Sequence, residues 1–275
     1  MQASDELIRI EPPVGLQIPD LRELWEYRGL IGRLAQRDLQ LRYKQTVAGV
    51  VWVAIQPLLS ALLLGSFFGR WLAPSTGRIS YVLFAFCGFV PWTYFVHGLT
   101  VGTYSVVKDQ ALVTKIRFPH MALPIGQILA GLVNLFITLL VLAILMLRSK
   151  VAPDANSVTL PLFVLLTFIT TTGVALWLSA LEVYYRDIDR ALPFFTQLWF
   201  FATPVAYSID VVPHKWRWLY CLNPMVGVVT GFRWCIFGTP IGGSVLLASI
   251  GISLLVLVSG MFFFRALEDK FADVI

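Results

Sequence analysis

Charged side chains are scarce in this chain: Asp, Glu, Lys and Arg together make up 13% of its 275 residues. Soluble domains carry about 25% charged residues, so this chain has too few to cover a surface that faces water. Hydrophobic residues make up 57%, and the mean hydropathy is +0.76. The composition indicates an integral membrane protein and gives no reason to expect a nucleic-acid partner.

Motifs for nucleotide hydrolysis and for water-exposed catalysis are also missing. No G-x-x-x-x-G-K-[ST] loop occurs, and no catalytic pair of carboxylates or Ser/His/Asp set stands between the apolar segments. Carriers driven by ion gradients place carboxylates near the middle of the membrane, whereas these segments hold almost no ionisable residues. We therefore expect no enzyme activity and no cofactor in this chain, but a passive conduit that takes its energy from elsewhere.

Cysteine and histidine are too few to hold the fold together. Three cysteines, Cys87, Cys221 and Cys235, do not make a disulfide framework. We expect free buried thiols, with a Cys221–Cys235 bond left open if both lie outside the membrane. The three histidines fall in separate segments without ligand spacing, so we expect no metal site.

Long apolar runs fill most of the rest of the chain. A helix needs about 20 apolar residues to cross a bilayer, and a barrel would show alternating strands of about 10 residues instead. The pattern predicts an all-α polytopic membrane protein. The first 46 residues hold no signal-peptide core, so the first span is expected to act as the insertion signal. The six predicted spans are 47–69, 81–105, 122–147, 159–183, 190–208 and 243–264.

Basic residues are distributed unequally between the two sides of these spans. Two thirds of the 21 Lys and Arg fall on the side of the N-terminus. The positive-inside rule then places both termini in the cytoplasm. The expected organisation is a cytoplasmic tail 1–20, an amphipathic helix 21–46, a membrane domain 47–264 and a cytoplasmic tail 265–275.

The segment 209–240 does not fit a seventh span. Pro213 and Pro224 interrupt it, and Arg233 would sit at membrane depth. Irregular backbone at that depth needs protein or a wet cavity around it. We predict two short re-entrant helices that enter from the outside and turn at Asn223-Pro224. The alternative is an ordinary external loop with aromatic anchors at the membrane surface.

The segment 21–46 carries an apolar stripe opposite a basic face. Arg33, Arg37 and Lys44 lie on the basic face of a helical wheel, and Arg42 flanks the apolar stripe. The residues of that stripe are Leu21, Leu24, Trp25, Ile31, Ala35, Leu39 and Tyr43. Such a helix suits the lipid headgroup region, and the Gly29 and Gly32 positions allow two shorter helices. The alternative is a solvated basic tail.

Two short cytoplasmic loops join the spans. "KDQALVTKIRFPHMALP" (108–124) is expected to form one or two helical turns that end by Pro119. Its apolar residues, such as Ile116 and Phe118, would lie in water unless a partner covered them. We read this loop as a docking element. A tight connector with its apolar side on lipid is the alternative.

Several short motifs, taken in order, give the chain a family resemblance from about residue 20 to its end. The stretch "RDLQLRYKQTVAGVVWVAIQP" (37–57) and the later "TKIRFP", "YYRDID", "TPVAY", "NP" and "FR" resemble the type-2 ABC exporter permeases of the polysaccharide and polyol-phosphate export family. Ala48 stands where that family usually has Leu. The matching positions of the first motif are Arg37, Asp38, Arg42, Tyr43, Lys44, Thr46, Gly49, Trp52 and Pro57.

The resemblance implies a homodimer in a bacterial inner membrane, with six spans and two external re-entrant helices per chain. It also implies two copies of a separate ABC ATPase, which bind ATP and Mg. The loop 108–119 would be the coupling helix, 182–190 a second contact, and 21–44 would flank the ATPase. The residues implied in docking are Leu112, Lys115, Ile116, Arg117, Phe118, Arg186 and Asp187.

The same resemblance implies a lipid-linked glycan as the cargo. Arg33, Arg37, Arg42 and Lys44 would attract the pyrophosphate of an undecaprenyl carrier, or bind lipid headgroups only. Aromatic rings would offer stacking surfaces to sugars, although an aromatic belt at the membrane interfaces explains such residues too. The proposed pathway residues are Trp92, Tyr94, Trp199, Phe200, Tyr207, Trp216 and Trp218.

Other cargoes and roles stay open from the sequence. They include export of teichoic acid, capsule, a drug or a small lipid, and a membrane assembly role without transport. The small-residue repeat Ala61, Gly65 and Gly69 favours close helix packing, either between two copies or within one chain.

Overall fold

The computed structural model describes residues 21–44, 49–72, 79–116, 118–268 and 270–274. The predicted tail 1–20 and Arg117 lie outside this range, as do Thr46 and Ala48. Every regular element among the described residues is a helix. The helices are α1 Leu21–Glu26, α2 Arg28–Tyr43, α3 Gly49–Leu72, α4 Tyr81–Lys108, α5 Gln110–Lys115, α6 Ala122–Arg148, α7 Leu160–Tyr184, α8 Ile188–Phe201, α9 His214–Cys221, α10 Pro224–Phe237, α11 Gly243–Glu268 and α12 Phe271–Val274.

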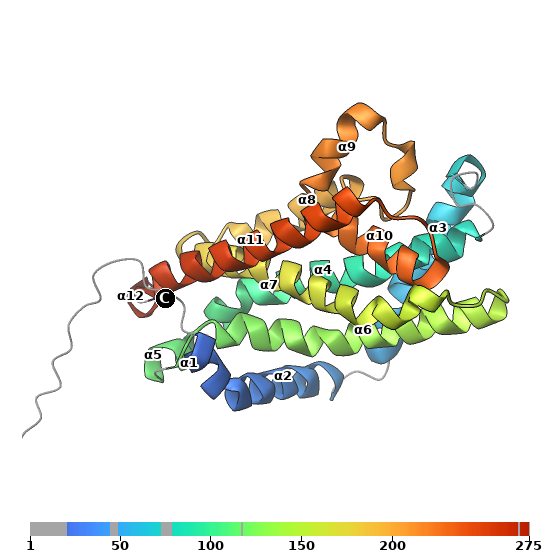
Figure 1. Ribbon diagram of the computed structural model, residues 1–275. Coiled ribbons are helices and arrows are strands. Elements are labelled where there is room, and N and C mark those ends of the chain that lie inside the picture. Colours follow the sequence, from blue (N-terminus) through green and yellow to red (C-terminus); the bar gives the residue numbers. More distant parts are fainter. Residues whose placement is uncertain (1–20, 45–48, 73–78, 117, 269, 275) are drawn as a thin grey trace, which may run out of the picture.

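Four of these helices are long and apolar enough to cross a membrane, namely α4, α6, α7 and α11. They match the predicted spans 81–105, 122–147, 159–183 and 243–264. The first predicted span, 47–69, corresponds to α3, whose apolar described part is the shorter Val51–Phe67. Figure 1 shows these helices side by side in one bundle, with α5 and α12 at the same end.

The fifth predicted span, 190–208, forms a much shorter helix than expected. α8 ends at Phe201 after 14 residues, which is about 21 Å of helix against about 30 Å of hydrocarbon. Turns follow from Ala202, because Pro204 lacks the N–H that would continue the ladder. Six full-length spans are therefore not found among the described residues.

The segment 209–240 forms two short helices that meet at Asn223-Pro224, as predicted. The Asn223 side chain accepts a hydrogen bond from the Met225 N–H and so caps α10. α10 packs against α4, α7 and α11, and nearly all of its residues are buried. α9 is far more exposed, with Trp218 at 63%. Protein of the same chain therefore covers α10, whereas it leaves α9 largely exposed.

α4 lies at the centre of the bundle (Figure 1). It contacts α3, α6, α7, α8 and α10, and most of its residues are buried. Ala61 of α3 is fully buried, and a Cβ on Gly65 would lie 2.9 Å from Val82 of α4. This part of the small-residue repeat therefore serves packing within the chain.

The N-terminal segment breaks into two helices at Tyr27. α2 runs beside α6 (Figure 1), and a Cβ on Gly126 would lie 3.1 Å from the Leu34 Cβ. The buried face holds Leu34, Ala35 and the charged Asp38, whereas Trp25 is 69% exposed. Protein, rather than headgroups alone, therefore covers one side of α2. The buried face shares Ala35 with the predicted stripe but is centred on Leu34 and Asp38 as well.

Candidate functional site

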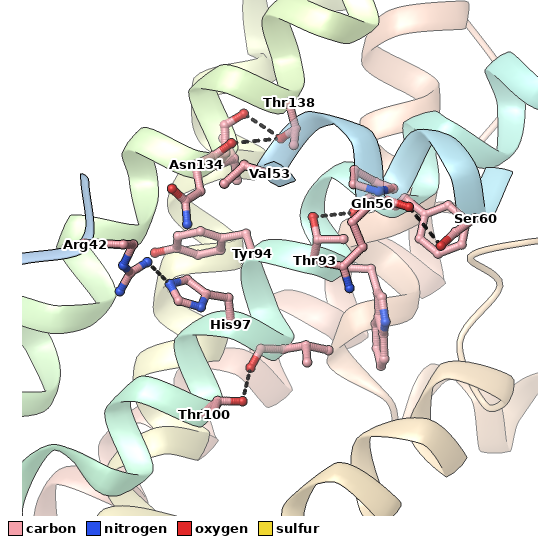
Figure 2. A pocket seen from close by; sticks show the side chains of 15 residues that line it. Arg42, Val53, Gln56, Ser60, Thr93, Tyr94, His97, Thr100, Asn134 and Thr138 are labelled. Atoms are coloured by element: carbon pink, nitrogen blue, oxygen red, sulfur yellow. Dashed lines mark hydrogen bonds between the residues drawn. The ribbon is translucent and has the colours of Figure 1, made fainter. Parts of the chain in front are cut away.

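A cavity of about 500 Å³ opens between the end of α2 and the middle parts of α3, α4 and α6 (Figure 2). His97 stands eleven residues before the end of α4 at Lys108, or about 16 Å along the helix. The cavity therefore lies well away from that end of α4, and Gln56 and Thr100 in its wall are exposed at the surface of the chain. Its lining residues are Arg42, Val53, Gln56, Pro57, Ser60, Phe89, Trp92, Thr93, Tyr94, Val96, His97, Thr100, Asn134, Leu135 and Thr138.

Arg42 brings a positive charge to this cavity. Its guanidinium Nη2 donates to Asp38 Oδ2 at 2.7 Å, and Nη1 contacts the His97 ring nitrogen Nε2. Asp38 is buried and also lies 3.5 Å from the Lys108 ammonium. Beside this group, Arg37 pairs with Asp109 at 2.5 Å. We call Arg37, Asp38, Arg42, Lys108 and Asp109 the ion cluster.

Three cations and two carboxylates make up the ion cluster, so one positive charge is in excess. Burial of an unpaired charge is expensive, and the pairing with Asp38 explains how Arg42 is held at depth. The cluster uses two of the four basic residues predicted for lipid or pyrophosphate. The other two, Arg33 and Lys44, are exposed and do not line the cavity.

A second cavity of about 300 Å³ lies between α4 and α8. Trp92, Val96 and Thr100 line both cavities. On the α8 side the wall is formed by Pro193, Thr196, Gln197 and Phe200. One stripe of α4 thus faces two hollows, one toward α3 and one toward α8.

The seven predicted pathway aromatics fall into three groups. Trp92 and Phe200 line the cavities and touch each other at 5.7 Å between ring centroids. Tyr94 lines the first cavity but is almost fully buried, with its hydroxyl donating to the Ile128 carbonyl. Of the seven, these three line one or both of the two cavities.

Trp199 and Tyr207 instead support the turn after α8. The Trp199 indole donates to Asn223 Oδ1 at 2.9 Å, and the Tyr207 hydroxyl donates to the Phe201 carbonyl. Trp216 and Trp218 of α9 are about half exposed or more and line neither cavity.

The predicted docking loop forms a single short helix, α5, which ends at Lys115. Leu112 is half-buried, whereas Lys115 and Ile116 are exposed. Phe118 differs from the prediction that it faces a partner: its side chain is buried, with its ring 5.2 Å from the His120 ring. Burial within the chain leaves Phe118 as a support for α5.

The second predicted contact is open to solvent. Arg186 and Asp187 are exposed at the turn between α7 and α8. The buried Glu182 holds this turn by accepting a hydrogen bond from the Asp189 N–H at 2.9 Å. α5 and this turn therefore offer exposed polar and apolar groups at the ends of spans.

Five residues at the site were not predicted as site residues. His97, Gln56 and Asn134 line the cavity, and Asp38 and Lys108 belong to the ion cluster beside it. His97 and Asn134 were visible as polar residues inside apolar runs, which is a signal of function in membranes. The pairing of Asp38 with Lys108 joins residues 70 positions apart, so no local pattern indicated it.

The described residues hold no group of three or more His, Cys, Asp or Glu suited to a metal ion. All three cysteines are free, and Cys235 is buried beside Thr159. The open possibility of a Cys221–Cys235 bond is thus not realised.

This chain is similar to known transport proteins over most of its length. The model of a family described as ABC-2 type transporter matches residues 29–237. An "O-antigen export system permease protein RfbA" of Myxococcus xanthus is 28% identical over 258 residues, which cover 93% of this chain and 98% of the relative. A protein of the same name from Klebsiella pneumoniae is 24% identical, with 88% of this chain and 93% of the relative covered. A "Polysialic acid transport protein KpsM" of Escherichia coli is 24% identical over 85% of this chain and 91% of its own length.

Proposed function

The chain belongs to the ABC-2 type transporter family, and on that premise we propose that it is the permease subunit of an ATP-driven exporter of a lipid-linked polysaccharide. The cargo would be similar to O antigen and would move outward from the cytoplasmic leaflet. The names of relatives that align over nearly their whole length support this cargo. The chain would supply the conduit, and separate ATPase subunits would bind ATP and Mg and supply the energy.

The double-sided stripe of α4 is the observation that carries the proposal. Trp92, Val96 and Thr100 face hollows on both sides, so a ligand could touch this stripe from α3 or from α8. Gln56 and Thr100 of the cavity walls are exposed in a lone chain, and a second copy would close the hollows into a channel. An aromatic ring between hydroxyl groups suits a sugar, which presents both C–H faces and hydroxyls.

Energy would enter at the end of the bundle where α5 and the 184–190 turn lie. Ile116 is 53% exposed and Tyr185 is 65% exposed. Apolar side chains at loop ends, with Lys115 and Arg186 beside them, suit a protein partner that covers them. We assign this surface to two copies of an ABC ATPase, one on each permease chain.

The orientation follows from the same assignment. Both termini would lie in the cytoplasm of a bacterial inner membrane, and α3 and α8 would complete six membrane passages despite the short length of α8. α9 and α10 would then be the external re-entrant pair. The buried state of α10 supports this reading, because it lets a short helix dip into the bilayer without contacting lipid on all sides.

Capsule export is the second candidate, since one relative is named for polysialic acid transport. The surplus positive charge of the ion cluster is compatible with such an acidic polymer. The same charge disfavours a cationic drug as the cargo. A membrane assembly role without transport would leave the cavities of α4 without a use.

Reconstitution with the cognate ATPase tests the function. ATP-dependent transfer of a radiolabelled lipid-linked glycan into a protected compartment is expected for the pair, and neither ATP hydrolysis nor transfer for the permease alone. Thr100→Phe would narrow both cavities, and transfer should fall at least about tenfold while the ATPase still binds. Ser244→Phe, exposed at the start of α11 and outside both cavities, is the control. Wild-type transfer by Thr100→Phe would remove the α4 stripe from the route.

A further inference from the structure

The larger cavity combines groups that are rare together inside a membrane. Its walls carry two side-chain amides, Gln56 and Asn134, and four serine and threonine hydroxyls, Ser60, Thr93, Thr100 and Thr138. Figure 2 shows these polar side chains around the cavity together with Arg42 and His97. Polar side chains within membrane-spanning segments usually face the interior of the protein or a water-filled cavity. This concentration points to a polar ligand.

The hydroxyls present mainly acceptors to the cavity. Each donates its proton to a carbonyl of its own helix: Ser60 to Gln56, Thr93 to Phe89, Thr100 to Val96 and Thr138 to Leu135. Their oxygen lone pairs remain for a donor such as a sugar hydroxyl. The amides of Gln56 and Asn134 offer donors as well as acceptors. The walls therefore suit a ligand with many hydroxyls.

Charge selects among such ligands. No carboxylate is found among the described residues that line the cavity, and the ion cluster beside it carries one positive charge in excess. Arg42 extends its guanidinium to the cavity wall next to His97 (Figure 2). A guanidinium binds phosphate oxygens by parallel charge-assisted hydrogen bonds. The cavity thus favours a hydroxyl-rich anion over a neutral sugar.

Size sets how much of a glycan fits. Pockets for small ligands have volumes of about 300–1,000 Å³, and this one measures about 500 Å³. A sugar or two with a phosphate fits this range, whereas a polymer does not. The ring of Trp92, which also lines the neighbouring cavity, marks the side toward which further sugars would extend.

We propose that this cavity binds the phosphate-linked first sugar of the glycan, with Arg42 on the phosphate and Asn134 and Gln56 on the sugar hydroxyls. The site deepens the proposed function and rests on it. In this proposal Arg42 binds the cargo, whereas the exposed Arg33 and Lys44 contact lipid headgroups only. The shared chemistry is a phosphate ester, so the test has to distinguish a glycan lipid from an ordinary phospholipid.

Binding to the purified full-length chain in nanodiscs tests the site directly. Three probes are used: farnesyl pyrophosphate carrying N-acetylglucosamine, farnesyl pyrophosphate alone, and phosphatidylglycerol vesicles as competitor. Arg42→Gln should weaken both pyrophosphate probes about tenfold or more, because a hydrogen bond to a charged group is lost. Asn134→Leu should weaken only the probe that carries the sugar.

Matched variants control for unrelated effects. Arg22→Gln removes an exposed cation from α1, and Val133→Leu changes an exposed neighbour of Asn134; both should bind like wild type. Because Arg42→Gln leaves Asp38 without one partner, the double variant Asp38→Asn/Arg42→Gln removes both charges. Where these fail to fold, Asn134→Leu and Gln56→Leu decide, since they leave the ion cluster intact.

Each outcome is decisive. Wild-type binding by the Arg42 and Asn134 variants overturns the site. The site is also overturned if phosphatidylglycerol competes equally with both pyrophosphate probes and the sugar adds no affinity. That result assigns the cavity to phospholipid headgroups. If the site variants bind normally while the wild-type exporter transfers glycan, the site fails and the function stands. If binding depends on Arg42 but the complete exporter transfers no glycan, the function fails and the site stands.

Discussion

Arg233 lies over the ring of Phe84, with its guanidinium carbon 3.6 Å from the centre of the phenyl ring. Its nitrogens also donate to the carbonyls of Pro204, Val205 and Tyr207 in the turn after α8. The side chain is 2% exposed. One residue of α10 thereby ties α4 to the end of α8, and these bonds explain how an arginine is kept inside an apolar bundle.

Replacement of Arg233 is expected to destabilise the chain severely. Arg233→Leu leaves several buried carbonyls without a donor, at about 1–3 kcal/mol each. Arg233→Lys keeps the charge but loses the planar arrangement of donors. Its thermal midpoint should therefore fall between those of the wild type and of Arg233→Leu. Fluorescence-detected size exclusion and thermal unfolding in detergent measure the effect. Lys215→Leu, which replaces an exposed cation of α9, should shift the midpoint by only a degree or two; a similar shift for both variants would contradict the role of Arg233.

Gly173 and Gly260 allow α7 and α11 to touch backbone to backbone. A Cβ on Gly173 would lie 2.6 Å from the Leu257 nitrogen, and one on Gly260 would lie 2.5 Å from the Gly173 carbonyl oxygen. Gly173→Ala is therefore expected to lower the free energy of unfolding by about 1–3 kcal/mol, because the helices have to separate. Gly251→Ala, on the neighbouring helix α11 with nothing within 4 Å of the added carbon, should be neutral or slightly stabilising. Denaturant titration of both variants measures the difference.

The positions of the long helices could be predicted because apolar length determines them. α4, α6, α7 and α11 each appear where an uninterrupted apolar run stands. The run 190–208 was misleading, since hydropathy does not register the loss of a backbone N–H at Pro204 or the carbonyls that Arg233 satisfies. Those contacts join residues 28 and 29 positions apart and follow no period.

The candidate site was less predictable than the fold. Arg42 and Trp92 were found because a basic cluster beside a span and aromatic density are local signals. Whether a side chain faces a cavity depends on which helices become neighbours. Phe118 shows the limit: its apolar ring in a short loop suggested a partner, but the chain covers that ring itself.

The C-terminal helix α12 is expected to hold α5 in position for its partner. Phe271 is fully buried, with its ring 5.2 Å from Phe264 and 6.4 Å from His120. Glu268 accepts a hydrogen bond from the His120 N–H and pairs with Arg265. Phe271→Ala removes a buried ring, so α12 should detach and the ATPase should bind at least about fivefold more weakly. Binding of the ATPase to nanodiscs measures this, with the exposed Val274→Ala as control. Unchanged affinity in Phe271→Ala would show that α5 needs no such support.

The Arg37–Asp109 pair is expected to couple α2 to the junction of α4 and α5. The two charges lie 2.5 Å apart, and the Asp109 side chain is only 13% exposed. A double-mutant cycle with Arg37→Ala and Asp109→Ala should give a coupling of about 1 kcal/mol in unfolding, above that of most surface pairs. The coupling should fall as salt is raised, because Arg37 is partly open to ions. Arg190 and Asp187 form the matched control, since they lie 3.6 Å apart with both side chains more than 80% exposed, and their cycle should give no measurable coupling. Equal values for the two cycles would mean that the link between α2 and α5 does not depend on charge.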